Sequence, residues 1–161
     1  HPLKINTDSA VVETRLLSLD AGAQLNRVIV SYHGLSAATP LAAGIVLHDT
    51  TTNFQADADR GYIAYADPVD RDNGQLYLAA ILPGGEVKSA QPVYFSAQEQ
   101  KTWGANGHLL ACNTYQPESS FTYYWGAGWS KWGFATQDDW FNFVRKESAK
   151  KAEPMMVIVV E

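Results

Sequence analysis

The sequence is poor in cysteine and in long hydrophobic runs. Cys112 is the only cysteine, so no disulfide can form within the chain, and cysteine content does not indicate a cellular compartment. The longest apolar run, residues 155–160, is far shorter than the ~20 residues that a helix needs to span a bilayer. We therefore interpret this run as a terminal strand and place Cys112 in the core. We expect no membrane as a partner.

Basic charge is also scarce. The chain of 161 residues has 12 lysines and arginines against 17 acidic residues, which gives a net charge of −5 at pH 7. The basic residues between positions 145 and 151 suit the last turns of a helix, where cations complement the helix dipole. Because phosphate binding needs a concentrated cationic surface, we expect no nucleic acid as a partner.

Several catalytic and cofactor motifs are missing as well. The sequence has no Gly-x-Ser-x-Gly elbow, no glycine-rich phosphate loop and no dinucleotide fingerprint. Its four histidines do not stand at the spacing of a zinc site. The segment from Asp70 to Gly74 resembles the start of a calcium loop, but Ile81 occupies the position of the bidentate acid. The segment is therefore interpreted as a hairpin turn, and no cofactor and no metal are expected.

What the sequence does contain is alternating apolar and polar residues in short segments separated by turn residues. This pattern predicts strands at residues 10–20, 25–33, 43–48, 61–66, 75–82, 93–96, 107–115 and 120–125. The first two segments are expected to form one hairpin and the last two another. The third segment is almost continuously apolar, which is typical of a strand that is buried on both faces.

A single helix is predicted over residues 137–151. Thr136 can cap its first amides, with Asp139 in the reciprocal position of a capping box. Trp140, Phe143 and Val144 stand at helical spacing and would dock on a sheet. The chain is thus predicted to be mainly β, one antiparallel β-sandwich domain over residues 1–161 with one C-terminal helix before the last strand.

Residues 121–133 combine three tryptophans, two tyrosines and three glycines in a short stretch. The aromatic first half predicts a strand, and the glycines are expected to break it into a corner. Trp129 and Lys131 would then emerge past the strand end, where an aromatic face beside a cation suits a sugar. The alternative is a corner whose tryptophans are simply buried.

His48 and His108 stand at the ends of predicted strands. A histidine there can act as a general acid or base, since its pKa lies near neutrality, or it can be a hydrogen-bonded wall residue. Tyr65 and Tyr124, in two other predicted strands, could also serve as a base.

Several short segments together resemble a family of uncharacterised secreted bacterial proteins that is named only as a domain of unknown function. The segments are Leu19-Asp-Ala-Gly22, Leu25-Asn-Arg27, Ala43-Gly-Ile-Val46 with His48, Asp72-Asn-Gly74, His108-Leu-Leu110, and Tyr124 with Gly126-Ala-Gly-Trp-Ser-Lys131. The last string is the most specific of them, and the resemblance covers nearly the whole chain.

The resemblance implies a biological setting and a fold. Members of that family tend to occur among genes for breaking down pectin-like polysaccharides, which implies a periplasmic or secreted location. They resemble the large two-sheet supersandwich of galactose-mutarotase-like proteins, which bind sugars on a concave sheet face, and this chain would form half of it. Members are usually about twice as long, so the chain would be the C-terminal part of a larger protein. An absent partner half, or self-association, would then cover an exposed sheet edge.

The residues leave two classes of function open, so the sequence does not decide whether the protein is an enzyme. One is a lyase or hydrolase on uronate-containing oligosaccharides, with His48, His108 and Tyr65 as catalytic candidates. The other is a non-catalytic carbohydrate-binding module or the structural half of a larger enzyme, with Trp125, Trp129 and Trp132 as a stacking platform. The expected substrate-binding residues are Arg27, Tyr124, Trp129 and Lys131, and the expected partner is an oligosaccharide or polysaccharide.

Overall fold

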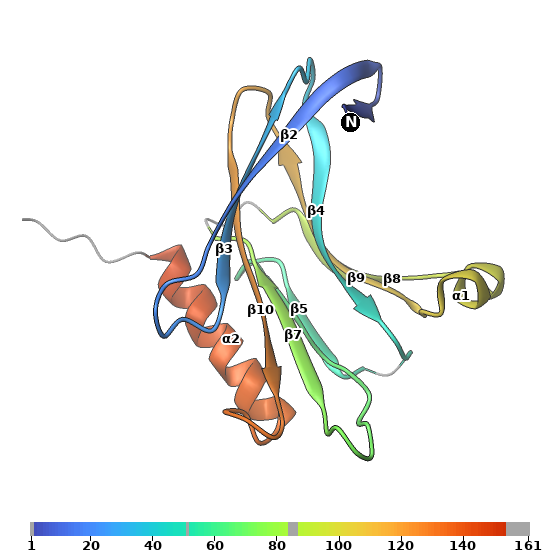
Figure 1. Cartoon of the computed structure of the whole chain (residues 1–161), viewed down its shortest axis with the longest axis vertical. Coiled ribbons are helices and arrows are strands. Elements are labelled where there is room, and N and C mark those ends of the chain that lie inside the picture. The colour runs from blue at the N-terminus through green and yellow to red at the C-terminus, as the bar shows by residue number, and fades with distance from the viewer. Residues whose placement is uncertain (1, 51, 84–86, 154–161) are drawn as a thin grey trace, which may run out of the picture.

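The computed structural model describes residues 2–50, 52–83 and 87–153 (Figure 1). The strands are β1 (Leu3–Ile5), β2 (Asp8–Ser18), β3 (Asn26–His33), β4 (Thr39–Leu47), β5 (Phe54–Asp57), β6 (Tyr62–Ala66), β7 (Leu76–Ile81), β8 (Ser89–Tyr94), β9 (Gly107–Tyr115) and β10 (Phe121–Trp129). The helices are α1 (Ala97–Trp103) and α2 (Gln137–Ala152). The chain is therefore mainly β, as the sequence predicts.

The strands form two antiparallel sheets. The larger sheet has the order β1-β2-β3-β10-β7-β6-β5, and the smaller has the order β4-β9-β8. The main contacts between the sheets join β4 to β7, β6 to β9 and β5 to β8. The small sheet contacts β5, β6 and β7 most, and the inner faces of β2 and β3 join the same core. The two sheets diverge toward the lower ends of β10 and β7 (Figure 1).

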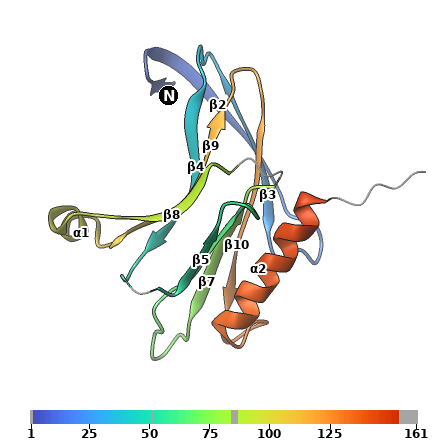
Figure 2. The same ribbon diagram turned by 180° about the vertical axis from the view of Figure 1, so that it is seen from behind.

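Helix α2 lies against the outer face of the large sheet, on β6 and β7 (Figure 2). Because side chains alternate along a strand, β6 is buried on both faces. Tyr62 and Ala64 pack against Trp140 and the rest of α2, whereas Ile63 and Tyr65 belong to the core between the sheets. The large sheet is thus the central layer of the molecule.

Three expectations about local structure are confirmed. Strands β2 and β3 form the first predicted hairpin, and Val28 and Val30 point to the same buried face of β3. The segment from Asp70 to Gly74 is a turn, closed by reciprocal backbone hydrogen bonds of 2.8 and 2.9 Å between these two residues. The capping box at the start of α2 is present, with Thr136 and Asp139 bonded to each other's backbone amides.

Two strand interpretations are wrong. Strands β9 and β10 do not form a hairpin, because they belong to different sheets and residues 116–120 turn the corner between them. Tyr115 holds this corner: its hydroxyl donates to the Ser119 carbonyl and accepts from the Tyr32 amide. Strand β4 is not buried on both faces, since Ala43, Ile45 and Leu47 face the core while the residues between them are exposed.

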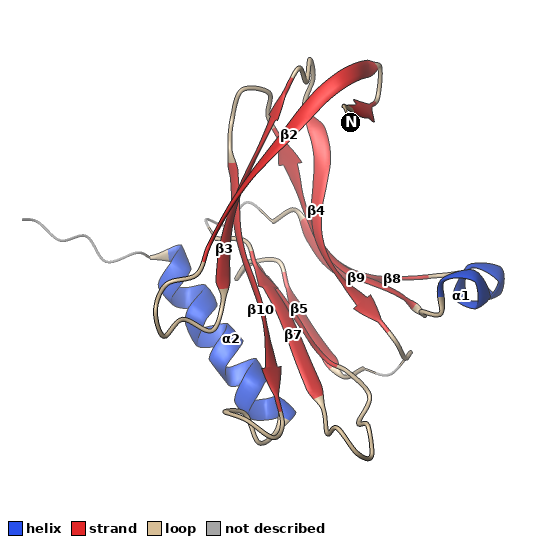
Figure 3. Cartoon of the chain, viewed as in Figure 1, coloured by secondary structure: helices blue, strands red, loops and turns tan. Residues whose placement is uncertain are grey.

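The prediction of a single helix is also wrong, as Figure 3 shows. Helix α1 follows β8, and Ser96 and Glu99 form a capping box at its start. It buries none of its residues, so it offered no apolar periodicity to recognise. In α2 the buried aromatic residues are Trp140 and Phe141, whereas Phe143 is only partly buried. The predicted last strand, residues 155–160, lies outside the described residues.

Candidate functional site

The inner face of β10, the face toward the small sheet, carries a row of aromatic rings. Phe121 is buried at the upper end of the row, Tyr123 is half-buried, and Trp125 and Trp129 are 43% and 40% exposed. Their odd positions place them all on one face, because side chains alternate along a strand. The row therefore follows β10 out of the core and into the region where the two sheets diverge.

The glycines of β10 explain why this strand continues where the sequence predicts a corner. Gly126 and Gly128 face α2 and the loop before β3, opposite the aromatic row. A Cβ atom on Gly126 would lie 2.6 Å from the Gln24 carbonyl oxygen, and one on Gly128 would lie 2.7 Å from the Trp140 ring. The glycines thus permit close packing on one face of the strand while the rings remain exposed on the other.

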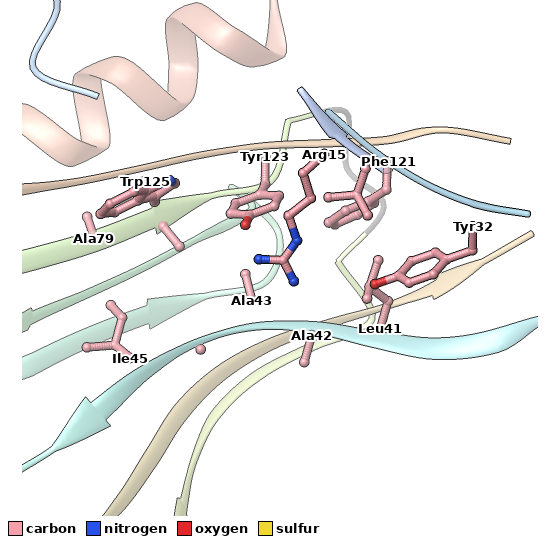
Figure 4. A pocket seen from close by; sticks show the side chains of 13 residues that line it. Arg15, Tyr32, Leu41, Ala42, Ala43, Ile45, Ala79, Phe121, Tyr123 and Trp125 are labelled. Atoms are coloured by element: carbon pink, nitrogen blue, oxygen red, sulfur yellow. The ribbon is translucent and has the colours of Figure 1, made fainter. Parts of the chain in front are cut away.

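A cavity of about 320 Å³ opens beside the middle of this row (Figure 4). Tyr123 and Trp125 line one side of it, and residues 41–45 of β4 line the other. Arg15 reaches in from β2, with its side chain 54% exposed. Figure 4 shows the Arg15 guanidinium group between Tyr123 and β4. The cavity therefore presents a cation beside two aromatic rings.

The charge of Arg15 is held in place by its neighbours. Its Nε donates to the Glu13 carboxylate, and this hydrogen bond is the main reason that the pKa of Glu13 is lowered. Burial raises the pKa of Tyr32 to about 12, with a further contribution from its hydrogen bond to Glu13. Among the contacts of the described residues, none joins the terminal guanidinium nitrogens of Arg15 to an acid. They can therefore bind an anionic group in the cavity.

A second cavity, of about 370 Å³, lies at the lower end of the row, beside Trp129. The Trp129 indole donates to the Asn73 carbonyl at 2.7 Å, which fixes the ring against the turn between β6 and β7. The Lys131 ammonium lies 5.8 Å from the centre of this ring. Asp67 and Asp70 also line the cavity, so an aromatic ring and two carboxylates meet there.

His48 lies next to this second cavity. Its Nδ1 is 2.8 Å from Oδ1 of Asp67, and its backbone amide donates to the Tyr65 hydroxyl at 3.1 Å. Tyr65 in turn donates to Oδ1 of Asp49 at 3.1 Å. Burial is the main cause of the raised pKa of Tyr65, so this phenol stays protonated at neutral pH in the arrangement shown.

The structure brings only part of the predicted site together. His48 and Tyr65 are in contact, and Trp129 and Lys131 lie near the same strand ends of the large sheet, beside the second cavity. His108 lies on β9 on the face of the small sheet that points away from the core, where its ring meets Phe95 edge-on at 4.9 Å.

Arg27 and Tyr124 lie elsewhere. They pair across β3 and β10, but Tyr124 packs with the α2 cluster, on the opposite side of the large sheet from Tyr65. The Lys151 ammonium lies 4.5 Å from the centre of the Tyr124 ring. The predicted site residues therefore do not share one sheet face.

Comparison with known proteins gives a family. The model of a family described as "Domain of unknown function (DUF4861)" matches residues 1–157 of the chain. The chain belongs to this family. "Uncharacterized protein P7" from Formosa agariphila is a relative, 24% identical over 153 residues. That match covers 94% of the chain but only 36% of the relative, so the chain spans about a third of the relative's length. No solved structure matches the chain.

The sequence did not predict the cavity that Arg15 lines. Arg15 and Glu13 stand in β2 among residues that look like an ordinary exposed strand face. The available signal was alternation: Glu13 and Arg15 share a face with Val11, which is buried. In the part of the chain that the structure describes, no group of three metal-binding side chains gathers, and no helix is long and apolar enough to span a membrane.

Proposed function

We propose that the protein binds an anionic oligosaccharide along the inner face of β10 and takes part in the breakdown of a uronate-containing, pectin-like polysaccharide. The observation that carries the proposal is the row of Tyr123, Trp125 and Trp129 beside the Arg15 guanidinium. Aromatic rings offer flat apolar faces to the C–H side of a sugar, and an arginine binds a carboxylate through two parallel hydrogen bonds. Uronates combine both chemical features.

The setting of the cavity supports this proposal. Glu13 fixes one nitrogen of Arg15 and leaves its other donors for a ligand. Tyr32, with its raised pKa, stays neutral at the wall of the cavity and helps to hold Glu13 through its hydrogen bond. A pre-positioned guanidinium loses less conformational freedom on binding, which favours affinity.

The proposal also includes a specific fold type and a cellular location. We take the two sheets as half of a galactose-mutarotase-like supersandwich, with the ligand on its concave face. A polymer of plant or algal cell walls lies outside the cell, so the site of action would be periplasmic or extracellular. The greater length of the relative agrees with a further part of the protein that this chain does not contain.

A second candidate function is elimination by a lyase. Figure 4 shows the Tyr123 hydroxyl on the same side of the cavity as the Arg15 guanidinium. Arg15 could neutralise the uronate carboxylate while Tyr123, as the phenolate, removes the proton on the carbon next to it; the C–O bond to the departing sugar then breaks to leave a carbon–carbon double bond, and water protonates the departing oxygen. This reaction would give an unsaturated product that absorbs in the ultraviolet.

Calorimetric titration with oligogalacturonates tests the proposal. Arg15→Gln should weaken binding by ~10-fold or more, because hydrogen bonds to charged groups contribute ~1.5–3 kcal/mol. Arg27→Gln is the matched control, since Arg27 lies on β3 opposite Tyr124 and outside the cavity. Equal losses in the two variants, or no binding by the unaltered protein, would refute the proposal. Ultraviolet absorbance in the same samples separates the lyase from the binding protein.

A further inference from the structure

We infer that the Trp129 end of the row takes an uncharged sugar unit, so that the ligand is a mixed oligosaccharide of uronate and neutral sugars rather than a homopolymer of uronates. This inference rests on the proposed function and assigns a different chemical preference to each end of β10. Trp125 and Arg15 select the charged unit, and Trp129 with its neighbouring acids selects the neutral one.

The Trp129 ring is the contact surface at this end. Its indole N–H is satisfied by the Asn73 carbonyl, which leaves the ring fixed beside a cavity of about 370 Å³. Lys131 is held in turn, because its ammonium group donates to the Asp72 carbonyl. A fixed ring can stack on a sugar without a large cost in conformational entropy.

The carboxylates of the same cavity decide which sugar can stack there. Hydrogen bonds from the Asn73 and Asp72 amides lower the pKa of Asp70, which keeps its carboxylate ionised at neutral pH. Asp67, also in the cavity, is held at 2.8 Å by His48. Among the described residues that line the cavity, the charged side chains are the acids Asp67 and Asp70, while Lys131 and His48 lie beside it, so the cavity disfavours a uronate. The hydroxyls of a neutral sugar can instead donate charge-assisted hydrogen bonds to these oxygens.

The distance between the two ends requires different sugar units. Trp125 and Trp129 are four residues apart on one strand, which corresponds to ~13 Å at ~3.3 Å per residue. This separation is longer than a single pyranose ring. A bound chain would therefore place one unit at Arg15 and a later unit at Trp129.

The experiment compares two probes by calorimetry: an oligogalacturonate, in which every unit is charged, and a glucuronoxylan oligosaccharide, in which neutral xylose units carry a uronate. The unaltered protein should bind the mixed probe more tightly. Trp129→Ala should weaken the mixed probe by ~10-fold, the effect of losing an anchoring tryptophan, and should leave the oligogalacturonate nearly unchanged.

Asp67→Asn provides an independent readout that does not depend on loss of binding. It removes one negative charge while keeping an oxygen for His48, so the affinity for the oligogalacturonate should rise by ~5-fold. Arg15→Gln should weaken both probes. If it weakens neither probe, the proposed function itself fails. If it weakens both while Trp129→Ala affects the two probes equally, or Asp67→Asn does not improve the charged probe, only the assignment of the neutral unit is overturned.

Discussion

Replacing Gly128 by alanine tests how closely α2 packs on β10. The added Cβ would lie 2.7 Å from Cε3 of Trp140 and 2.9 Å from Cδ2 of Phe134, both inside the van der Waals distance. Trp140 has no room to move, because it is fully buried, stacks on Tyr77 and donates from its indole to the Leu78 carbonyl at 3.1 Å. Alanine at this position therefore forces either the helix or the strand to shift.

The expected cost follows from over-packing of a filled core. Inserting one methyl group into such a core lowers the free energy of unfolding by ~1–3 kcal/mol. For a domain of this size that corresponds to a fall in Tm of ~2–12 °C. Circular dichroism can follow the melt, since both sheets and α2 contribute to the signal.

Gly44→Ala is the matched control on another strand. Its Cβ would meet Cδ2 of Leu110 at 2.8 Å, but Leu110 is only partly buried on the face of the small sheet away from the core and can turn aside. We expect no loss of stability, or a small gain from the reduced freedom of the unfolded chain. If Gly128→Ala melts at the same temperature as the unaltered protein, α2 does not pack on β10 as described.

Three further predictions concern the core, the charged pair and the short helix. Phe141→Ala should lower the free energy of unfolding by ~3–5 kcal/mol in denaturant titrations, and Phe143→Ala by clearly less, because Phe141 is buried and Phe143 is not; equal losses would contradict this packing. Because Arg15 lowers the pKa of Glu13, their pair stabilises the fold above the ordinary glutamate pKa of ~4.3 and this contribution disappears as pH falls through the lowered pKa. Because Arg15 is half-exposed, the pair contributes at most ~1 kcal/mol to the free energy of unfolding. The Tm of Glu13→Gln should therefore lie slightly below that of the unaltered protein at neutral pH and equal it in acid. A Tm difference that persists in acid would refute the account. Ser96→Ala should increase amide exchange in α1 without moving the global Tm, since α1 buries no residue; a lowered global Tm would show that α1 supports the core.

Most strands could be predicted from the sequence because their alternation is local. Val28 and Val30 mark the buried face of β3 wherever its neighbours lie. Pairing between sheets is not local: nothing in residues 107–125 shows that β9 and β10 separate at the Tyr115 corner. The glycines of β10 suggested a break, and only the Trp140 ring behind them shows that they serve packing.

The candidate site was harder to predict because it depends on which strands meet. Trp129 and His48 could be identified from their residue type and their position at strand ends. In the structure Trp129 lines a cavity together with Asp67, and His48 is in contact with the Asp67 carboxylate. Arg15 could not, since an arginine in an exposed strand usually faces solvent. Its place in the cavity follows from β4 and β10 lying on either side of it, which is a property of the tertiary fold.

The most direct test of the proposed binding surface is a titration followed by the indole N–H signals of the five tryptophans in a nitrogen-15 correlation spectrum. With a glucuronoxylan oligosaccharide, the Trp125 and Trp129 signals should shift. Trp103 and Trp132, which are 70% and 80% exposed but lie outside both cavities, should stay in place, as should buried Trp140. Shifts confined to Trp103 or Trp132, with Trp125 unchanged, would contradict binding along β10.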